Sequence, residues 1–172
     1  MSIEKVREYL KAWNREGDII EMNASTATVA DAAASLGVIP ARIAKTISLK
    51  AACVPLPGNE TGTGDQAAAM LVVCAGDMKL DNRKFKDFFG FKAKMLSPEE
   101  ALEYTGHAIG GVCPFGLPGG IPVYLDVSMK RFETVYPACG SGNSAIELRP
   151  DELEKYGRNK MWVDVCKPIE SA

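Results

Sequence analysis

Residues 106–120 read GHAIGGVCPFGLPGG, a run of fifteen residues with six glycines and two prolines. Glycine lets the backbone adopt positive φ and lets a ligand approach without meeting a Cβ, whereas proline stiffens the path. The segment is too apolar for a flexible linker. It is therefore either a rigid loop whose backbone N–H groups hold a small anionic or carbonyl-bearing ligand, or a tight connection between a helix and a strand.

The segments around this loop predict one mixed domain over residues 1–172. Ser97 and Glu100 form a capping signature that opens a helix over 98–105, and the apolar run 121–126 predicts a strand. Similar signals predict helices over residues 3–15, 29–36, 81–89 and 150–156, strands over residues 18–22, 46–49, 67–75, 131–136, 145–148 and 161–165, and a polar hairpin connection over residues 54–66. Because the strands do not alternate regularly with helices, we expect an α+β fold with a mixed, curled sheet.

The composition is that of an ordinary globular protein, with 47% hydrophobic and 24% charged residues and a net charge of −2. This charge argues against a strongly electropositive nucleic-acid binder and hence against a DNA partner, but leaves brief contact with one end of an RNA open. No apolar run reaches the about 20 residues of a membrane span, and residues 3–15 form an amphipathic helix rather than a signal peptide. We therefore expect a cytoplasmic protein with no membrane partner.

The cysteines predict free thiols rather than a disulfide framework. They are five in number and contain no C-x-x-C pair: Cys53, Cys74, Cys113, Cys139 and Cys166. Most are expected to be small buried hydrophobic residues. Because the chain has a single histidine and no metal-ligand spacing, we expect neither a metal site nor a cofactor. An alternative is a thiol-dependent regulator built on Cys113 and Cys139, which both lie in glycine-bearing turns.

A basic cluster lies between positions 79 and 94. It consists of Lys79, Arg83, Lys84, Lys86, Lys92 and Lys94. A solvated helix face is the favoured interpretation, and contact with the end of an RNA is the alternative.

Two further features carry polar groups. Lys45 stands where a helical turn leads into an apolar strand, a position from which its ammonium can bind a phosphate or stabilise developing negative charge. The alternative is a surface lysine whose aliphatic chain packs on apolar neighbours. The turn GSGNS at residues 140–144 has hydroxyl, amide and backbone N–H groups that could orient a small polar ligand. Its simpler interpretation is a hairpin turn.

With their flanks, the glycine loop, Lys45 and this turn resemble the YbaK/ProX/EbsC-like aminoacyl-tRNA deacylases, also found as an editing domain within bacterial prolyl-tRNA synthetases. The matching residues are SLGVIP at 35–40 before AKT at 44–46, TG at 105–106 with GGVCPFG at 110–116, and Gly140 with AIEL at 145–148. The resemblance extends in order and spacing from about Thr28 to about Leu153.

The resemblance implies a mixed, barrel-like sheet surrounded by helices, and hydrolysis of the ester that joins a wrong amino acid to the 3′ adenosine of a tRNA. The partner is then the acceptor end of an aminoacyl-tRNA, with a synthetase as a further candidate. The catalytic residues implied are Lys45, Gly110 and Gly111. The substrate-binding residues implied are Thr46, His107, Val112, Cys113, Pro114, Gly140, Ser141, Gly142, Asn143 and Ser144.

An aminoacyl ester is already reactive, so its hydrolysis needs placement, a water and stabilisation of the oxyanion rather than a strong base. We expect loop N–H groups to bind the scissile carbonyl and Lys45 to anchor the phosphate of the terminal adenosine or the polar end of the substrate. The ribose hydroxyl of the substrate or a backbone carbonyl would activate the water. We expect His107 to be structural or a substrate contact rather than a general base, because cysteinyl-specific members carry an aromatic residue there.

Two positions depart from the cysteinyl-specific branch of this family. That branch has a serine and an aspartate flanking the second glycine turn, where this chain has Ala138 and Ala145. The departure argues against cysteinyl specificity, and the Gly142-Asn143-Ser144 element suggests a branch that removes a small uncharged amino acid. The alternative from another class is a non-catalytic module that binds a nucleotide-ended molecule or a protein in the same pocket.

Overall fold

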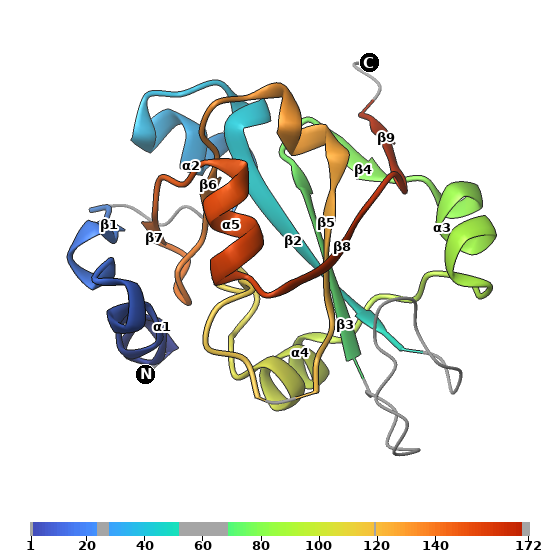
Figure 1. The fold of residues 1–172 in the computed structure, drawn as a ribbon, viewed down its shortest axis with the longest axis horizontal. Helices are drawn as coiled ribbons and strands as arrows, with labels where there is room; N and C mark the ends of the chain where they lie inside the picture. The colour runs from blue at the N-terminus through green and yellow to red at the C-terminus, as the bar shows by residue number, and fades with distance from the viewer. Residues whose placement is uncertain (1, 24–27, 52–68, 119, 170–172) are drawn as a thin grey trace.

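The computed structural model describes residues 2–23, 28–51, 69–118 and 120–169. Its centre is a mixed five-stranded sheet with the strand order β6-β2-β3-β5-β8, curled into a half-barrel (Figure 1). The strands are β2 (Ile43–Lys50), β3 (Ala69–Ala75), β5 (Val123–Asp126), β6 (Tyr136–Pro137) and β8 (Asn159–Val163). Only β2 and β3 run antiparallel, and the other neighbours are parallel. The expected α+β class with a mixed, curled sheet is confirmed.

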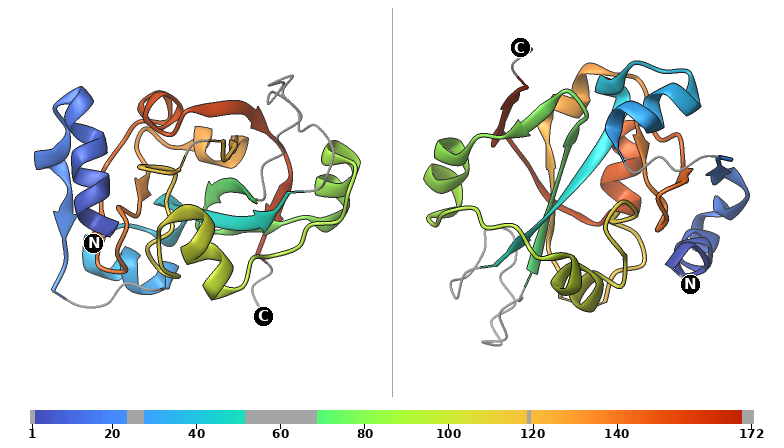
Figure 2. Two further views of the ribbon diagram at one scale, coloured as in Figure 1. Left: turned by 90° about the horizontal axis from the view of Figure 1, so that it is seen from below. Right: turned by 180° about the vertical axis from the view of Figure 1, so that it is seen from behind.

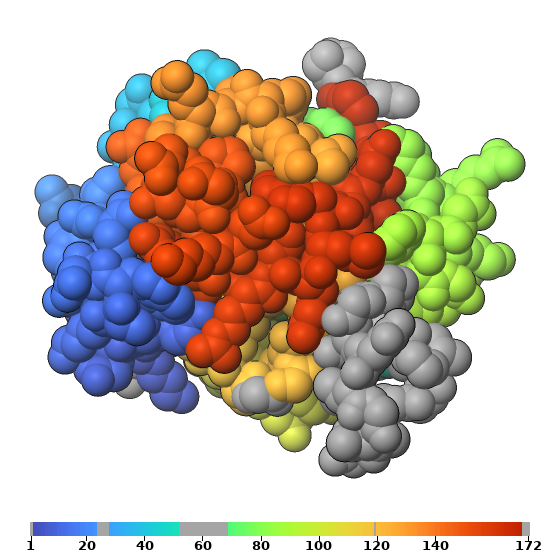
Figure 3. Space-filling view, in the orientation of Figure 1, coloured from blue at the N-terminus to red at the C-terminus, as the bar shows by residue number. Residues whose placement is uncertain are grey.

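Five α-helices surround the sheet in the described part of the chain. They are α1 (Ser2–Leu10), α2 (Val29–Leu36), α3 (Asn82–Phe89), α4 (Pro98–Thr105) and α5 (Pro150–Tyr156). Figure 2 shows α1 and α3 at opposite ends of the molecule. The space-filling view shows α5 and β8 crossing one face between these two ends (Figure 3). No helix among the described residues is long and apolar enough to span a membrane.

Strand β3 is buried along its whole length, and its alternating side chains divide between two cores. Leu71 and Val73 belong to one core, together with residues of α1, α4 and α5. Val72 and Cys74 belong to the other, together with two phenylalanines of α3. Because successive side chains of a strand point to opposite faces, one apolar run supplies both cores.

Helices with complete local signals begin and end where the sequence predicts. Thr28 caps α2 by accepting a hydrogen bond from the Asp31 N–H, and Gly37 ends this helix in the left-handed conformation. Ser97 and Glu100 form the predicted capping box at the start of α4. Helices α3 and α5 likewise lie within one residue of prediction. The helix predicted over 3–15 ends earlier, because α1 gives way to a 3-10 helix over Lys11–Trp13.

Several predicted strands are wrong in extent. The strand predicted over 131–136 begins later, because its first residue belongs to a 3-10 helix over Val127–Arg131, which Asp126 opens by accepting a hydrogen bond from the Ser128 N–H. Only a bridge at Val135 and the first residue of β6, Tyr136, remain of it. Only β7 (Ser144–Ala145) and a bridge from Leu148 to Val135 remain of the strand predicted over 145–148. Strand β1 shortens to Ile20–Glu21 and pairs with β7.

The structure also contains a two-stranded ladder that the sequence analysis does not predict. Strand β4 (Met78–Leu80) pairs antiparallel with β9 (Cys166–Pro168). The strand predicted over 161–165 is replaced by β8, which begins earlier and ends at Val163. The polar connection predicted over 54–66 and Cys53 lie outside the described residues.

Candidate functional site

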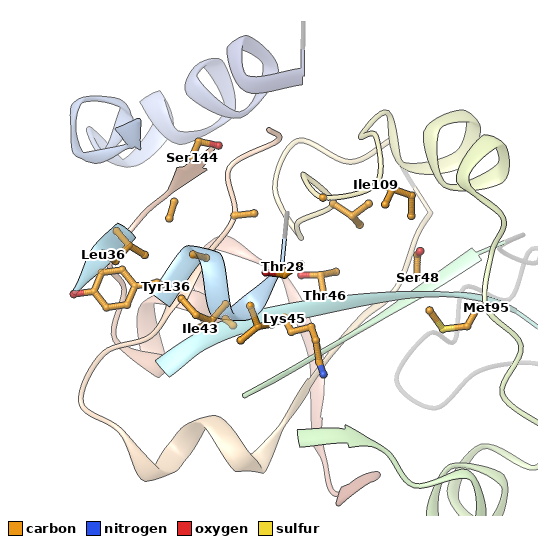
Figure 4. A pocket seen from close by; sticks show the side chains of 17 residues that line it. Thr28, Leu36, Ile43, Lys45, Thr46, Ser48, Met95, Ile109, Tyr136 and Ser144 are labelled. Atoms are coloured by element: carbon orange, nitrogen blue, oxygen red, sulfur yellow. The ribbon is translucent and has the colours of Figure 1, made fainter. Parts of the chain in front are cut away.

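A cavity of about 210 Å³ follows strand β2 between α2 and the glycine loop (Figure 4). Its walls come from six segments: Thr28, Val29, Ala32 and Leu36; Ile43, Ala44, Lys45, Thr46 and Ser48; Met95; Ile109, Gly110 and Val112; Tyr136 and Ala138; Ser144 and Ala145. The lining is mainly apolar, and none of these described residues is a histidine, cysteine, aspartate or glutamate. The cavity therefore resembles a ligand site with few polar groups that set orientation.

Thr46 contributes the most informative polar atom of this lining. Its hydroxyl oxygen is buried and has no hydrogen-bond partner among the described residues. Figure 4 shows Thr46 and Ser48 on the side of β2 that faces Ile109. A buried hydroxyl without a partner is unfavourable, so this atom is poised to exchange a hydrogen bond with a molecule that enters the cavity.

Lys45 lies within β2 and not at the end of a helical turn as the sequence suggests, because the strand already begins at Ile43. Its half-buried side chain leaves the strand on the opposite side from Thr46, as adjacent strand residues do. The Nζ atom donates a hydrogen bond to the carbonyl oxygen of Met78, the first residue of β4. An ammonium has three donors, so two remain for a ligand.

The glycine loop presents its backbone through a tight turn over residues 108–111. Gly111 donates its N–H to the carbonyl oxygen of Ala108 at 2.9 Å, and Gly110 has a φ of 92°. This positive φ at the third position is the feature that a type II turn requires, which explains the glycine. The N–H of Gly111 is thus occupied, whereas the N–H of Gly110 makes no hydrogen bond to the described residues, and Gly110 lines the cavity.

Gly111 brings the two glycine segments into direct backbone contact. A Cβ at this position would lie 2.6 Å from the carbonyl carbon of Gly140 and 2.7 Å from the nitrogen of Ser141. Gly140 is packed in turn against the backbone of Ser2, with its own φ at 92°. The structure therefore brings together the 110–114 and 140–144 segments that the sequence analysis treats as one site.

The 140–144 turn contributes less to the cavity than its composition suggests. Ser141 Oγ lies 2.9 Å from Asn143 Oδ1 and 2.7 Å from Ser144 Oγ, and Asn143 donates from Nδ2 to the Met22 carbonyl at 3.1 Å. Only Ser144 of this turn lines the cavity, while Gly140, Ser141, Gly142 and Asn143 do not. The turn joins β1 to β7 through the Asn143–Met22 hydrogen bond, and its Gly140 and Ser141 backbone packs against Gly111 of the glycine loop.

His107 is fully buried outside the cavity and ties three segments together. Its Nε2 lies 2.8 Å from the carbonyl oxygen of Phe115, and its Nδ1 is hydrogen-bonded to the hydroxyl of Ser2. A carbonyl only accepts, so these partners assign the proton to Nε2 and leave Nδ1 as the acceptor. Both ring nitrogens are occupied, which fits a structural role and leaves no nitrogen for a general base.

We expect protonation of His107 to destabilise the fold. Burial lowers its pKa below the ordinary value of 6.5, and the charge of Lys5 acts in the same direction. Between the two pKa values the unfolded chain binds more protons, so the free energy of unfolding falls as the pH falls from about 6.5. Urea unfolding between pH 5 and pH 8 measures this dependence. Because this is the only histidine, His107→Gln should abolish the component near pH 6.5, and an unchanged slope in the variant would contradict the assignment.

Cys113 and Pro114 belong to the core and not to the cavity wall. Burial raises the pKa of Cys113 to about 12 and raises that of Cys139 well above its usual range. Pro114 is buried, and its Cγ would lie 3.5 Å from a Cβ at Gly157. A thiol reacts as the thiolate, so the structure argues against a regulator built on these two cysteines. Val112 lines both the cavity and the core.

Sequence reasoning misses several lining residues. Ser48 could have been found from strand alternation, two positions after Thr46. Ile109 and Met95, whose exposed fractions are 60% and 61%, carry no local signal for a cavity. Tyr136 comes from a segment predicted as the end of another strand, and its hydroxyl donates to Glu147 Oε2 at 2.9 Å.

A family model for the aminoacyl-tRNA editing domain matches residues 23–156. The chain belongs to this editing-domain family. YwhH, an uncharacterised protein of Bacillus subtilis strain 168, is 54% identical over 170 residues, covering 99% of this chain and 100% of that protein. A proline–tRNA ligase of Pelobacter propionicus is 31% identical over 104 residues, which are 60% of this chain and 16% of the ligase.

Solved structures agree with this membership. The editing domain matches a structure described as a candidate trans-editing enzyme for prolyl-tRNA synthetase, with a TM-score of 0.79, 27% identity, and coverage of 96% of this chain and 97% of that one. It also matches hypothetical protein APE2540, with a TM-score of 0.75, 30% identity, and coverage of 95% and 99%. The resemblance to the deacylase family is confirmed. Membership of the family supports aminoacyl-tRNA editing in general.

Proposed function

We propose that this editing domain is a deacylase that hydrolyses the ester between a small uncharged amino acid and the 3′ adenosine of a mischarged tRNA. The observation that carries the proposal is the composition of the cavity. It combines the unpartnered Thr46 hydroxyl and the Gly110 N–H with an apolar wall, and its described lining contains no acid, histidine or thiol. Such a site can orient an ester but offers no side chain as a base.

In the proposed reaction, the oxygen of a water attacks the ester carbonyl and the Gly110 N–H stabilises the oxyanion that forms. The bond from the carbonyl carbon to the ribose 3′ oxygen then breaks. The neighbouring ribose hydroxyl of the substrate relays the water proton to the leaving 3′ oxygen, which gives a free amino acid and an uncharged tRNA end. Thr46 orients the substrate, and Lys45 holds the phosphate of the terminal adenosine on the β4 side of the strand.

The alanine pair supports a small uncharged amino acid as the group removed. Ala138 and Ala145 both line the cavity and face each other in a β-bridge. Their methyl groups stand where the cysteinyl-specific branch has a serine and an aspartate. The wall is therefore apolar at this point, and an amino acid with a charged side chain would lose the hydration of that side chain without gaining a hydrogen bond or an ion pair here.

Deacylation of Ala-, Cys-, Ser- and Thr-tRNA tests the proposal. We expect one or two of these esters to be hydrolysed, and a lack of hydrolysis for all four would favour the binding-module alternative. Thr46→Val should lower kcat/KM about tenfold, as for one lost hydrogen bond. It should leave the free energy of unfolding within about 1 kcal/mol of wild type, since Oγ1 has no partner to lose.

Thr105→Val is the matched control. The Thr105 hydroxyl is also buried, but it donates to the Ala101 carbonyl at 2.6 Å and accepts from the His107 N–H at 3.1 Å. This variant should therefore lose about 1–3 kcal/mol of stability. Equal kinetic effects of Thr46→Val and Thr105→Val would show that the Thr46 hydroxyl does not contact substrate.

A further inference from the structure

The edge formed by β4 and β9 carries two opposed cations. Lys79 and Lys167 are direct partners in the antiparallel register, and both are exposed. Residues paired in this way point to the same face of the ladder, and like charges directly opposite each other destabilise it. The pair is therefore unfavourable as it stands, and an anion bound by both lysines would relieve it.

Two acidic side chains that lie next to this edge in sequence are engaged elsewhere. Asp77 forms an ion pair with Arg131 at 2.6 Å, and Asp164 forms one with Lys84 at 3.1 Å. Lys84 belongs to the basic cluster between positions 79 and 94, and this ion pair neutralises its charge. These two carboxylates are thus not available to balance the lysines of the edge.

Asp81 is the acid whose charge acts on Lys167, and it too has a structural task. Its Oδ1 caps α3 by accepting hydrogen bonds from the N–H groups of Arg83 and Lys84 at 3.0 and 3.1 Å. These bonds and the nearby lysines lower the pKa of Asp81. Within the described part of the chain, no carboxylate forms an ion pair with Lys79 or Lys167.

The edge adjoins the candidate site directly. Lys45 donates from Nζ to the carbonyl of Met78, the residue that precedes Lys79 on β4. Strand β9 reaches the surface beside α3 (Figures 1 and 3). The backbone of β4 therefore lies within hydrogen-bond distance of the Lys45 ammonium, and Lys79 is the next residue along that strand.

We propose that the β4–β9 edge binds backbone phosphates of the tRNA acceptor end, upstream of the terminal adenosine. The inference rests on the proposed function and extends the same site outward. Lysine contacts a phosphate as a flexible point charge and does not read a base, so the edge supplies affinity and register rather than sequence preference. It also reconciles a net charge of −2 with RNA binding, since the contact is local.

Binding of uncharged tRNA at several salt concentrations tests the edge. Each neutralised phosphate contributes about 0.7–0.9 to the slope of log K against log salt. Lys79→Ala combined with Lys167→Ala should therefore reduce the slope by about 1.5 and weaken binding at least tenfold. The matched control is Lys155→Ala with Lys160→Ala, two exposed lysines on α5 and β8 with the same charge change. An unchanged slope in the first pair, or equal losses in both pairs, would overturn the proposal.

A minimal ester separates this inference from the proposed function. An aminoacyl-adenosine without upstream nucleotides cannot reach the edge, so the Lys79/Lys167 double variant should hydrolyse it at the wild-type rate. If the double variant hydrolysed this ester more slowly than wild type, the two substitutions would have altered the cavity itself, and the proposal of a separate phosphate contact would be wrong. Salt-dependent tRNA binding by a wild-type protein that hydrolyses no ester would reject the deacylase function while leaving the docking edge in place.

Discussion

Replacement of Lys45 by alanine is expected to lower kcat/KM for the preferred aminoacyl-tRNA by about 100-fold. A hydrogen bond between an ammonium and a phosphate contributes about 1.5–3 kcal/mol, which corresponds to a factor of about ten to 150. A phosphate contact is present in both the ground state and the transition state, so the loss should fall mainly on KM. Steady-state kinetics with labelled aminoacyl-tRNA measures both constants.

Lys50→Ala controls for the loss of a positive charge on the same strand. Lys50 ends β2, pairs with Glu100 at 3.5 Å and does not line the cavity. This variant should retain the wild-type kinetics. Full activity of Lys45→Ala across all four charged tRNAs would refute the role of Lys45.

The second large effect is expected for Gly111→Ala. The added Cβ would meet three backbone atoms at 2.6–2.7 Å, and backbone cannot rotate away as a side chain can. The loop must therefore move from Gly140 and carry the Gly110 N–H with it. We expect a loss of about 1–3 kcal/mol in stability from overpacking. We also expect a fall of about 100-fold in kcat, because a displacement of about 1 Å at a reacting centre can have that effect.

Gly142→Ala, in the 140–144 turn that Gly111 contacts, is the matched control. A Cβ at Gly142 would have no heavy atom within 4 Å, and its φ is not in the left-handed region. Urea unfolding and single-turnover hydrolysis should both remain near wild type for this variant. Wild-type stability and activity in Gly111→Ala would show that the two segments do not need their close contact.

The helices were the predictable part of this fold because their signals are local. Thr28 and Gly37 bound α2, and Ser97 and Gly106 bound α4, through hydrogen bonds between residues close in sequence. Pairing in the short strands is decided by residues far apart. Strand β4 has three residues and is completed by β9, near the other end of the chain, so no pattern in either segment predicts the ladder.

The same distinction applies to the candidate site. The sequence resemblance singles out Lys45, Thr46 and the glycine loop, and the structure brings Lys45, Thr46, Gly110 and Val112 around one cavity. His107 and Cys113 belong to the same loop in sequence, yet both are fully buried and neither lines the cavity. Adjacency along a turn does not determine which side chains face a ligand, because packing against α1 decides that orientation.

By itself, the sequence determined the boundaries of α2, α3, α4 and α5 to within one residue and the glycines that permit a tight turn. Only the tertiary structure decided that β2 already begins at Ile43, which places Lys45 and Thr46 on opposite sides of one strand. The tertiary structure alone also decided three properties of the described residues. The N–H of Gly111 is hydrogen-bonded to the Ala108 carbonyl whereas the N–H of Gly110 makes no such bond, the Thr46 hydroxyl has no hydrogen-bond partner, and Lys79 lies opposite Lys167. The physical reason is that local propensity acts through neighbours in the chain. Hydrogen-bond satisfaction and charge balance depend on every group that folding brings into contact.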